Sequence, residues 1–214
     1  LKAAFYTAIQ DDYIRKNPFD FQLNTVLEDD TEPKVPLSPT QEASFLSFIE
    51  GDKVYRKYYD EIAILLGTGL RISELCGLTE KDIDFENRLI NVDHQLLKVS
   101  GIGYHIEVPK TKSGVRQIPM STKVCEAFQR VLQERKRTTP FTVGGYSGFL
   151  FLNRDGLPKV AVNYESMFRG LVKKYNKCHE EALPKVTTPH TLRHTFCTNL
   201  ANAGMNPKAL QYIM

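Results

Sequence analysis

The sequence predicts a mixed α/β fold that is mainly helical and carries one small antiparallel sheet. Apolar residues recur at helical spacing through most of the chain, as Val124 and Phe128 do in residues 122–137. Between residues 88 and 120 they alternate with polar residues, as in strands with one buried face. With 214 residues and 42% hydrophobic content, the chain can bury the core of one domain and part of another.

A proline-rich stretch divides the predicted elements into two groups. Small and apolar residues predict a helix over residues 1–16, which Pro18 should end. Charged residues and prolines predict a linker over residues 28–37. We therefore expect the end of a helical domain in residues 1–27 and a main domain in residues 38–214.

Glycine and proline residues mark the elements of the main domain. Helices are predicted at about 40–50, at 55–67, near Ile72, at 122–137, at 161–176, and after Pro189 and Pro207. Gly67 and Gly69 should end the second of these helices. In the sheet, a tight turn at Ser113-Gly114 is predicted to join strands at 106–108 and 115–118.

The net charge of +3 conceals an uneven distribution of charged side chains. Residues 1–97 carry ten basic and eighteen acidic side chains, whereas residues 98–137 carry nine and three and residues 138–214 nine and four. A basic middle and C-terminal part is typical of a protein with one face that meets a polyanion. The basic run at 130–137 alone would also fit the solvated end of a helix.

Cysteine spacing and hydropathy argue against several other classes of protein. The four cysteines form no Cys-x-x-Cys pair, which favours reduced, mostly buried thiols over disulfides or a zinc site. No apolar run approaches the roughly 20 residues that span a membrane, and no signal-peptide pattern is present. We expect a soluble intracellular protein. Because Leu1 is not a start residue, we also expect the sequence to derive from a longer chain.

The richest candidate site lies at the start of the helix that follows Pro189. His190, Arg193 and His194 share one helix face, and the unpaired amides of a helix start favour an anion. An imidazole, a guanidinium and amide donors could therefore bind a phosphate there. The histidine pair also has the spacing of a zinc site, but no glutamate follows His190 and Arg193 would repel the metal. For His194, a packing role is the simpler interpretation.

A second arginine and a basic hairpin lie upstream of this site. Arg71 follows Gly69 where a helix begins, within reach of Glu74, although an ordinary surface ion pair is the alternative. Lys110 and Lys112 lie near the predicted hairpin tip and share a strand face. Either lysine could enter a DNA minor groove and protonate a leaving oxygen, whereas many exposed hairpin lysines serve solubility alone.

Three motifs occur together, in this order: Gly-Thr-Gly-Leu-Arg-Ile-Ser-Glu-Leu at 67–75, Lys-Thr-x-x-x-x-Arg at 110–116, and Pro-His-x-x-Arg-His-Thr-Phe at 189–196. Each is weak alone, but the ordered set resembles the tyrosine recombinase (phage-type integrase) family. The stretches at 90–96 and 204–214 are most similar to integrases of conjugative transposons. The resemblance covers nearly everything from Ser38 onward, and residues 1–27 resemble the end of that family's helical core-binding domain.

The resemblance implies a role for each residue that matches a motif. Arg71 and Arg193 match the two catalytic arginines, which hold the scissile phosphate and stabilise its developing charge. His190 matches the histidine that assists proton transfer. Glu74 matches the acidic residue that braces the first arginine. The implied fold is a tyrosine-recombinase-type catalytic domain.

The basic hairpin and the reaction are implied in the same way. Lys110 best matches the general acid for the 5′-oxygen, with Lys112 as the alternative, and both Lys112 and Arg116 are expected DNA contacts. The implied reaction is transesterification without metal or nucleotide, through a 3′-phosphotyrosyl intermediate. The implied partners are double-stranded DNA at element ends and target, further copies of the protein in a tetramer, and a directionality factor, all in the bacterial cytoplasm.

The sequence departs from the family pattern at its C-terminal end. The family's second histidine (or tryptophan) and its nucleophilic tyrosine follow the segment that ends here at Met214. Tyr212 lies ahead of the expected position, beside Leu210 and Ile213, and is interpreted as core packing. As given, the sequence should bind a phosphodiester without cleaving it. The alternatives are a type IB topoisomerase, a non-catalytic DNA-binding regulator derived from an integrase, and a zinc-dependent hydrolase that uses His190 and His194.

Overall fold

The computed structural model describes residues 1–21, 35–109, 114–135, 141–184 and 186–214. The chain falls into two compact units, Leu1–Pro33 and Lys34–Met214. Most of the predicted linker lies outside the described residues, and so do Lys110 and Lys112.

The first unit contains helix α1 (Lys2–Gln10), which is shorter than the helix predicted over residues 1–16. The amide of Tyr13 donates to the carbonyl of Ala8 at 2.8 Å, and that of Asp12 donates to Ile9 at 3.1 Å. Asp12 has a φ of 58°, so this left-handed residue turns the chain out of the helix. The sequence did not predict this early end of the helix, because the left-handed position is occupied by aspartate and not by glycine, the usual residue there.

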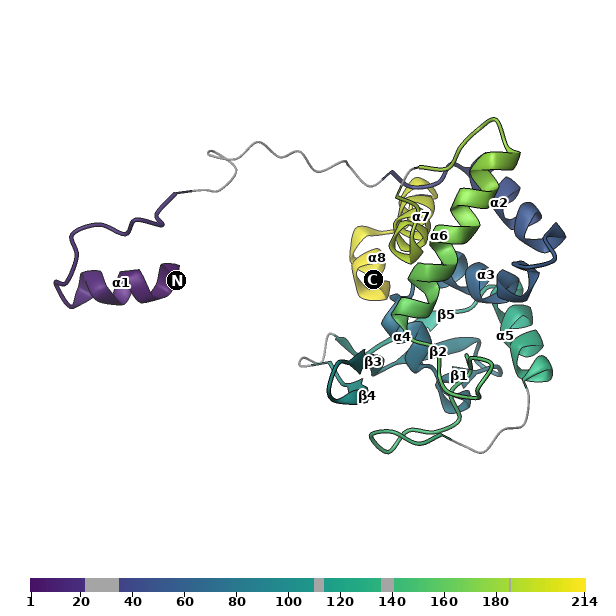
Figure 1. The fold of residues 1–214 in the computed structure, drawn as a ribbon, viewed down its shortest axis with the longest axis horizontal. Coiled ribbons are helices and arrows are strands. Elements are labelled where there is room, and N and C mark those ends of the chain that lie inside the picture. Colours follow the sequence, from purple (N-terminus) through teal and green to yellow (C-terminus); the bar gives the residue numbers. More distant parts are fainter. Residues whose placement is uncertain (22–34, 110–113, 136–140, 185) are drawn as a thin grey trace. The chain divides into compact units, whose positions relative to one another are not determined.

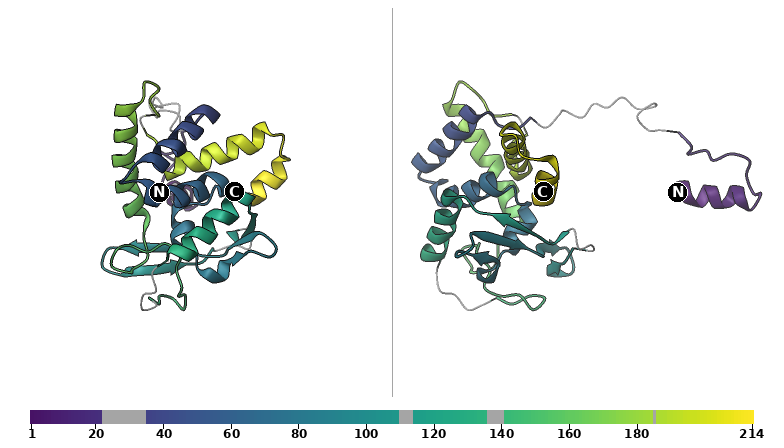
Figure 2. Two further views of the ribbon diagram at one scale, coloured as in Figure 1. Left: turned by 90° about the vertical axis from the view of Figure 1, so that its right-hand side faces the viewer. Right: turned by 180° about the vertical axis from the view of Figure 1, so that it is seen from behind.

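The second unit is mainly helical, as predicted. Its helices are α2 (Pro39–Gly51), α3 (Tyr59–Thr68), α4 (Ile72–Gly77), α5 (Thr122–Glu134), α6 (Ala161–Cys178), α7 (Pro189–Asn202) and α8 (Pro207–Ile213), with 3-10 turns η2 (Arg56–Tyr58) and η3 (Glu80–Asp82). The strands lie at one end of this unit, and the helical body lies to one side of them (Figure 1). Figure 2 shows the strands and the helices of this second unit from two further directions.

Helix α2 illustrates how local sequence sets an element's start. The Ser38 hydroxyl oxygen accepts a hydrogen bond from the Gln41 amide at 3.1 Å, and the Gln41 side chain accepts one from the Ser38 amide at 3.0 Å. This reciprocal capping box, with Pro39 at the first helical position, fixes the beginning of the helix. The Leu37 amide donates to the Thr195 hydroxyl at 2.9 Å, which anchors this entry to α7.

Helix α3 lies at the centre of the core and packs against α2, α5 and α7. Its side chains Ile62, Ile64 and Leu65 are fully buried. The same hydrophobic core also contains Phe45, Ile90, Phe128, Tyr164, Leu171 and Leu192. Because the C-terminal end of α3 leads into the motif at 67–75, this packing positions the segment that carries Arg71 against α7.

The strands form two antiparallel sheets. In the first, β2 (Leu89–Val92) lies between β1 (Ile83–Asp84) and β5 (Arg116–Pro119). The second is a hairpin of β3 (Gln95–Val99) and β4 (Gly103–Glu107).

The predicted pairing of residues 106–108 with residues 115–118 is wrong. Within the described residues, β4 pairs with β3, and β5 pairs with β2, where Ile118 lies opposite Ile90. The turn signal that was missed is Gly101 and Gly103, which have φ values of 79° and 87°. Pairing with β2 brings Arg116, the first residue of β5, into the interior of the unit.

The cysteines and helices bear on the remaining structural expectations. All four cysteines lie within the described residues and are free thiols. Only Cys76 is buried, while Cys178 is exposed and Cys125 and Cys197 are half-buried, so the expectation of mostly buried thiols was too broad. Across the part of the chain that the structure describes, no helix combines the length and the apolar character needed to cross a membrane.

Candidate active site

Arg71 lies at the sharp junction between α3 and α4. Gly69 ends α3 with a φ of 63°, and its amide donates to the Leu65 carbonyl at 3.0 Å. A Cβ atom at this position would lie 2.4 Å from the Phe196 ring of α7, so the junction requires glycine for both conformation and space. The chain then enters α4 with Arg71 at its N-cap position.

Glu74, on the first turn of α4, accepts hydrogen bonds from both the backbone and the side chain of Arg71. The Arg71 amide donates to Oε2 of Glu74 at 2.8 Å, and its Nη1 donates to Oε1 at 2.8 Å. The Arg71 side chain is 53% exposed, whereas that of Glu74 is 8% exposed. One edge of the guanidinium is therefore fixed, and the remainder faces solvent. The contact expected between Arg71 and Glu74 is present.

Arg116 approaches the same carboxylate from β5. Its Nη1 and Nη2 atoms donate to Oε1 and Oε2 of Glu74 at 2.9 and 2.7 Å, the bidentate geometry of a strong ion pair. Its Nε donates to the carbonyl oxygen of Ile213 in α8 at 2.7 Å. The side chain is 3% exposed. Arg116, which the sequence suggested as a DNA contact, is instead buried and paired, because β5 packs against α8 and places this side chain beside Glu74.

Arg193 completes the cluster from α7. Its Nη1 donates to the Gly69 carbonyl at 2.5 Å and lies 4.0 Å from Oε2 of Glu74. Its Nη2 donates to the carbonyl oxygen of Met214. We call Arg71, Glu74, Arg116 and Arg193 the arginine–glutamate cluster.

The ionisation of the cluster follows from its burial and charges. Burial, together with the positive charges of Arg71 and Arg116, lowers the pKa of Arg193 to about 10, and Glu74 offsets part of this effect. Burial raises the pKa of the Glu74 carboxyl, but the hydrogen bonds and charge of Arg116, helped by Arg71, outweigh it and leave that pKa below its ordinary value. Near neutral pH, three guanidinium groups therefore surround one carboxylate, an excess of positive charge that suits a phosphate.

His190 is an exposed residue on the otherwise buried first turn of α7, three residues before Arg193 on the same helix. Its ring meets that of His194 edge to face, with centroids 4.6 Å apart. His194 is half-buried, as a packing role requires. Among the described residues, the group of three that lies close enough to hold a metal is Asp82, Asp93 and His94, and it includes neither of the two histidines named for the zinc alternative.

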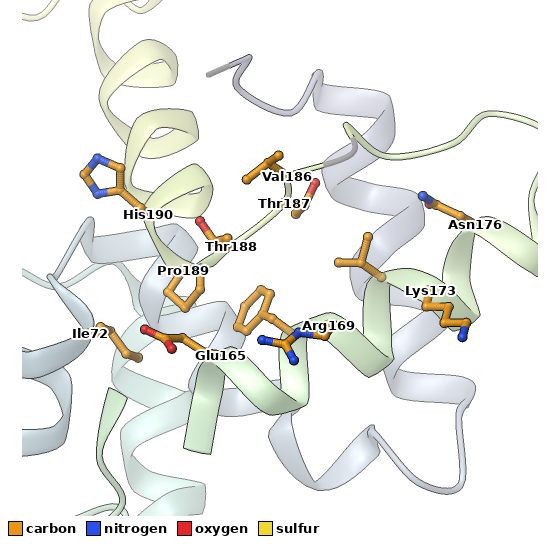
Figure 3. Close-up of a pocket in the computed structure, with 12 residues that line it drawn as sticks. Ile72, Glu165, Arg169, Lys173, Asn176, Val186, Thr187, Thr188, Pro189 and His190 are labelled. Carbon is orange, nitrogen blue, oxygen red and sulfur yellow. The ribbon is translucent and has the colours of Figure 1, made fainter. Parts of the chain in front are cut away.

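A cleft of about 650 Å³ opens beside His190, between α6 and the segment that enters α7; we call it the α6–α7 cleft. Figure 3 shows Glu165, Arg169 and Lys173 along α6, opposite Thr188 and His190. Arg169 and Lys173 are exposed, and neither forms a hydrogen bond or ion pair with another residue that the structure describes. These two cations were not predicted as site residues from the sequence, although their i, i+4 spacing on a predicted helix was the available signal.

Tyr212 does not have the surroundings expected of it. The side chain is 59% exposed, whereas Ile213 beside it is buried. On α8 the inward face carries Leu210 and Ile213, three residues apart, and Tyr212 lies on the other side. The interpretation of Tyr212 as core packing was therefore wrong.

A mainly helical domain with two small antiparallel sheets, in which two arginines meet around a buried glutamate, is the arrangement that the motif resemblance implies. The chain belongs to the phage integrase family, whose model matches residues 36–214. The family resemblance and the fold class expected from the sequence are thereby confirmed.

Individual relatives agree with this assignment. The chain is 64% identical over 214 residues to the transposase from transposon Tn916 of Enterococcus faecalis. The matched region covers 100% of this chain and 53% of that protein. It is 29% identical over 203 residues to the tyrosine recombinase XerA of Pyrococcus horikoshii, covering 93% of this chain and 61% of that protein. The chain spans about half the length of curated relatives that it matches, such as the Tn916 transposase.

Solved structures show the same fold. The Tn1549 transposon integrase in complex with a circular intermediate DNA superposes with a TM-score of 0.95 at 72% identity, covering 100% of this chain and 67% of that one. The crystal structure of XerA recombinase superposes with a TM-score of 0.62 at 24% identity over 100% of this chain and 67% of that one, a likeness of fold alone.

Proposed function

We propose that the full-length protein is a site-specific DNA recombinase, an integrase of a mobile element. The observation that carries this proposal is the arginine–glutamate cluster, in which Arg71 and Arg193 are held side by side with His190 on the same helix as Arg193. Two planar guanidinium groups can bind the non-bridging oxygens of one phosphodiester. Family membership supports the same function.

The proposed reaction is a pair of transesterifications. A tyrosine hydroxyl attacks phosphorus, its proton leaves, the P–O5′ bond breaks and the 5′-oxygen takes up a proton, which leaves a 3′-phosphotyrosyl bond. The 5′-hydroxyl of another strand then attacks the same phosphorus and releases the tyrosine. We propose that this tyrosine lies beyond residue 214 of the full-length protein and that no metal or nucleotide takes part.

Each residue of the site has a proposed part in this reaction. Arg71, through its exposed edge, and Arg193 stabilise charge that develops on the phosphate oxygens. His190 assists proton transfer. Lys110 is the proposed general acid for the 5′-oxygen, with Lys112 as the alternative and a DNA contact.

The proposed partner is double-stranded DNA at the ends of the element and at its target. Structures of the Tn1549 integrase were obtained in complex with circular intermediate DNA and with transposon right end DNA, which supports this substrate class. We further propose a tetramer in the active assembly, a directionality factor, and a bacterial cytoplasmic location, where such DNA resides. The basic residues of the α6–α7 cleft offer additional phosphate contacts.

The test is capture of the covalent intermediate by the full-length protein on a nicked duplex that loses its 5′-hydroxyl strand after cleavage. The parent protein should accumulate a protein–DNA adduct. Arg71→Ala should lower its rate of formation by at least about 100-fold, because one transition-state donor is lost, and should leave the DNA dissociation constant within about fivefold.

Three other outcomes would point elsewhere. An adduct on the nicked duplex, together with relaxation of a separate supercoiled DNA without joining of two DNA sites, would favour a type IB topoisomerase. DNA binding without any adduct would favour a non-catalytic regulator. Equal losses of binding and cleavage in Arg71→Ala would make that arginine an anchor for DNA rather than a catalytic residue.

A further inference from the structure

We propose that Arg116 is a positioning residue of the phosphate site: it neutralises Glu74, so that Glu74 can orient Arg71 without cancelling the positive charge that Arg71 and Arg193 offer to the phosphate. The inference rests on the proposed function, because it assigns a part in that reaction. In this role Arg116 does not touch DNA, and it takes no direct part in making or breaking bonds.

The geometry of Arg116 fits this role. Both of its terminal nitrogens bind the two oxygens of Glu74, at 2.9 and 2.7 Å, while its Nε is occupied by the Ile213 carbonyl at 2.7 Å. All three sides of the guanidinium fork are therefore used inside the protein. At 3% exposure the side chain has no surface to offer a ligand. The bond to Ile213 fixes the plane of the guanidinium so that it faces Glu74 squarely.

Glu74 needs such a partner because it serves Arg71 at the same time. Its oxygens accept from both the Arg71 amide and the Arg71 Nη1, each at 2.8 Å. A carboxylate is the acceptor that can hold a guanidinium edge and a helix-start amide together. Its negative charge, however, lies 4.0 Å from the Nη1 of Arg193 and directly beside Arg71, where it would weaken the attraction for an anion.

Counting charges shows what Arg116 contributes. With Arg116 present, three guanidinium groups against one carboxylate leave two positive charges. Without it, one positive charge would remain. A phosphodiester carries one negative charge, and the five-coordinate transition state formed by attack of an oxyanion carries two. The extra positive charge therefore stabilises the transition state more than the bound substrate, which is the requirement for an effect on rate rather than on binding.

A purely structural role for Arg116, in which it only ties β5 to α4 and α8, predicts a different dependence on Glu74. If Arg116 acts by neutralising Glu74, its loss should matter only while Glu74 is charged. If it acts as a tie, its loss should matter equally when Glu74 is replaced by a neutral residue of the same shape. A double-mutant cycle separates these two cases.

The experiment uses the full-length protein and single-turnover formation of the covalent adduct on the nicked duplex. The variants are Arg116→Met, Glu74→Gln and the double variant that combines them. Arg116→Met keeps much of the side-chain length without the charge, and we expect it to slow adduct formation by at least about 100-fold with the DNA dissociation constant within about threefold. In the Glu74→Gln background, the same change should cost less than about threefold.

A small loss in Arg116→Met, or an equally large loss in the Glu74→Gln background, would overturn the inference. If the single Arg116→Met variant does not fold, as judged by thermal unfolding, the pair Glu74→Gln and Arg116→Met/Glu74→Gln decides the question by the same threefold criterion. A parent protein that forms no adduct would overturn the proposed function and this inference together. A cleaving parent with an unaffected Arg116→Met variant would overturn this inference alone.

Discussion

The arginine–glutamate cluster and the α6–α7 cleft both present positive charge close to the N-terminal half of α7, yet they are built in opposite ways. In the cluster, Arg193 is 8% exposed, and each of its donors described above has a partner at fixed geometry. In the cleft, Arg169 and Lys173 are exposed and unpaired with other described residues. One region holds its cations in place, and the other leaves them free to move.

Under the proposed function, this difference separates two tasks that a site acting on DNA has to perform. A transition state needs donors already oriented where charge develops, because reorientation during the reaction costs free energy. A DNA backbone needs only nearby positive charge, which long solvated side chains supply and which salt screens. We therefore expect the cluster to govern rate and to depend on the chemical type of each residue. The cleft should govern affinity and depend on charge alone.

The largest expected effect comes from replacing one arginine of the cluster by lysine. Arg193→Lys retains a positive charge but loses the planar fork that bonds the carbonyls of Gly69 and Met214 and that, in the proposed reaction, faces the phosphate. The adduct-formation rate of the full-length protein should fall by at least about 100-fold. The matched control is Arg169→Lys in the cleft, which should stay within about threefold of the parent. Equal effects at the two positions would contradict the idea that the cluster governs rate while the cleft governs affinity.

Next in size is the effect of adding a methyl group at the junction that brings the cluster together. Gly69→Ala places a Cβ 2.4 Å from Phe196 at a φ of 63°. Left-handed strain and overpacking should lower the free energy of unfolding by about 2–4 kcal/mol in all, as measured by urea denaturation. Gly204→Ala is the control, because its φ is 80° but nothing lies within 4 Å, and it should cost about 1 kcal/mol. Similar losses would show that contact with Phe196 is unimportant.

The comparison also shows where sequence reasoning was sufficient. Helix periodicity and proline positions predicted the helices of the second unit, because both depend on residues adjacent in the chain. The same local logic predicted that Glu74 would reach Arg71 three residues away. Motif resemblance then marked Arg193 and His190, although nothing local indicated that Gly69 and Arg193 would touch.

What the sequence did not predict depends on contacts between distant residues. Arg116 was assigned to the DNA surface because its motif places it on a basic hairpin. The pairing of β5 with β2 instead buries it against Glu74, forty-two residues away along the chain. Tyr212 was misplaced because a short helix with two apolar neighbours has no periodicity long enough to define its inward face. Strand pairing and the packing of short helices depend on tertiary contacts, which local sequence patterns do not determine.

A smaller effect should appear in the dependence of stability on pH. Burial raises the pKa of Glu74, but Arg116 and Arg71 lower it further, so its folded value lies below its unfolded one. The stabilisation from its ionised form is then fully present above the ordinary glutamate pKa of about 4.3, and it is lost as pH falls through the folded value. Free energies of unfolding measured in urea should therefore fall more steeply below about pH 4.3 in the parent than in Glu74→Gln. Parallel curves would contradict the assigned shift.

The smallest effect is expected in the cleft, and it concerns salt. If Arg169 and Lys173 each neutralise one phosphate, replacing both with alanine removes two counterion-release events. The slope of log affinity against log salt should become shallower by up to about 1.8, with adduct formation at saturating DNA unchanged. Lys123→Ala, an exposed lysine on α5, should leave the slope as it is. An unchanged slope in the double variant would place the DNA backbone elsewhere, whereas a slower reaction at saturation would give the cleft a part in positioning the phosphate.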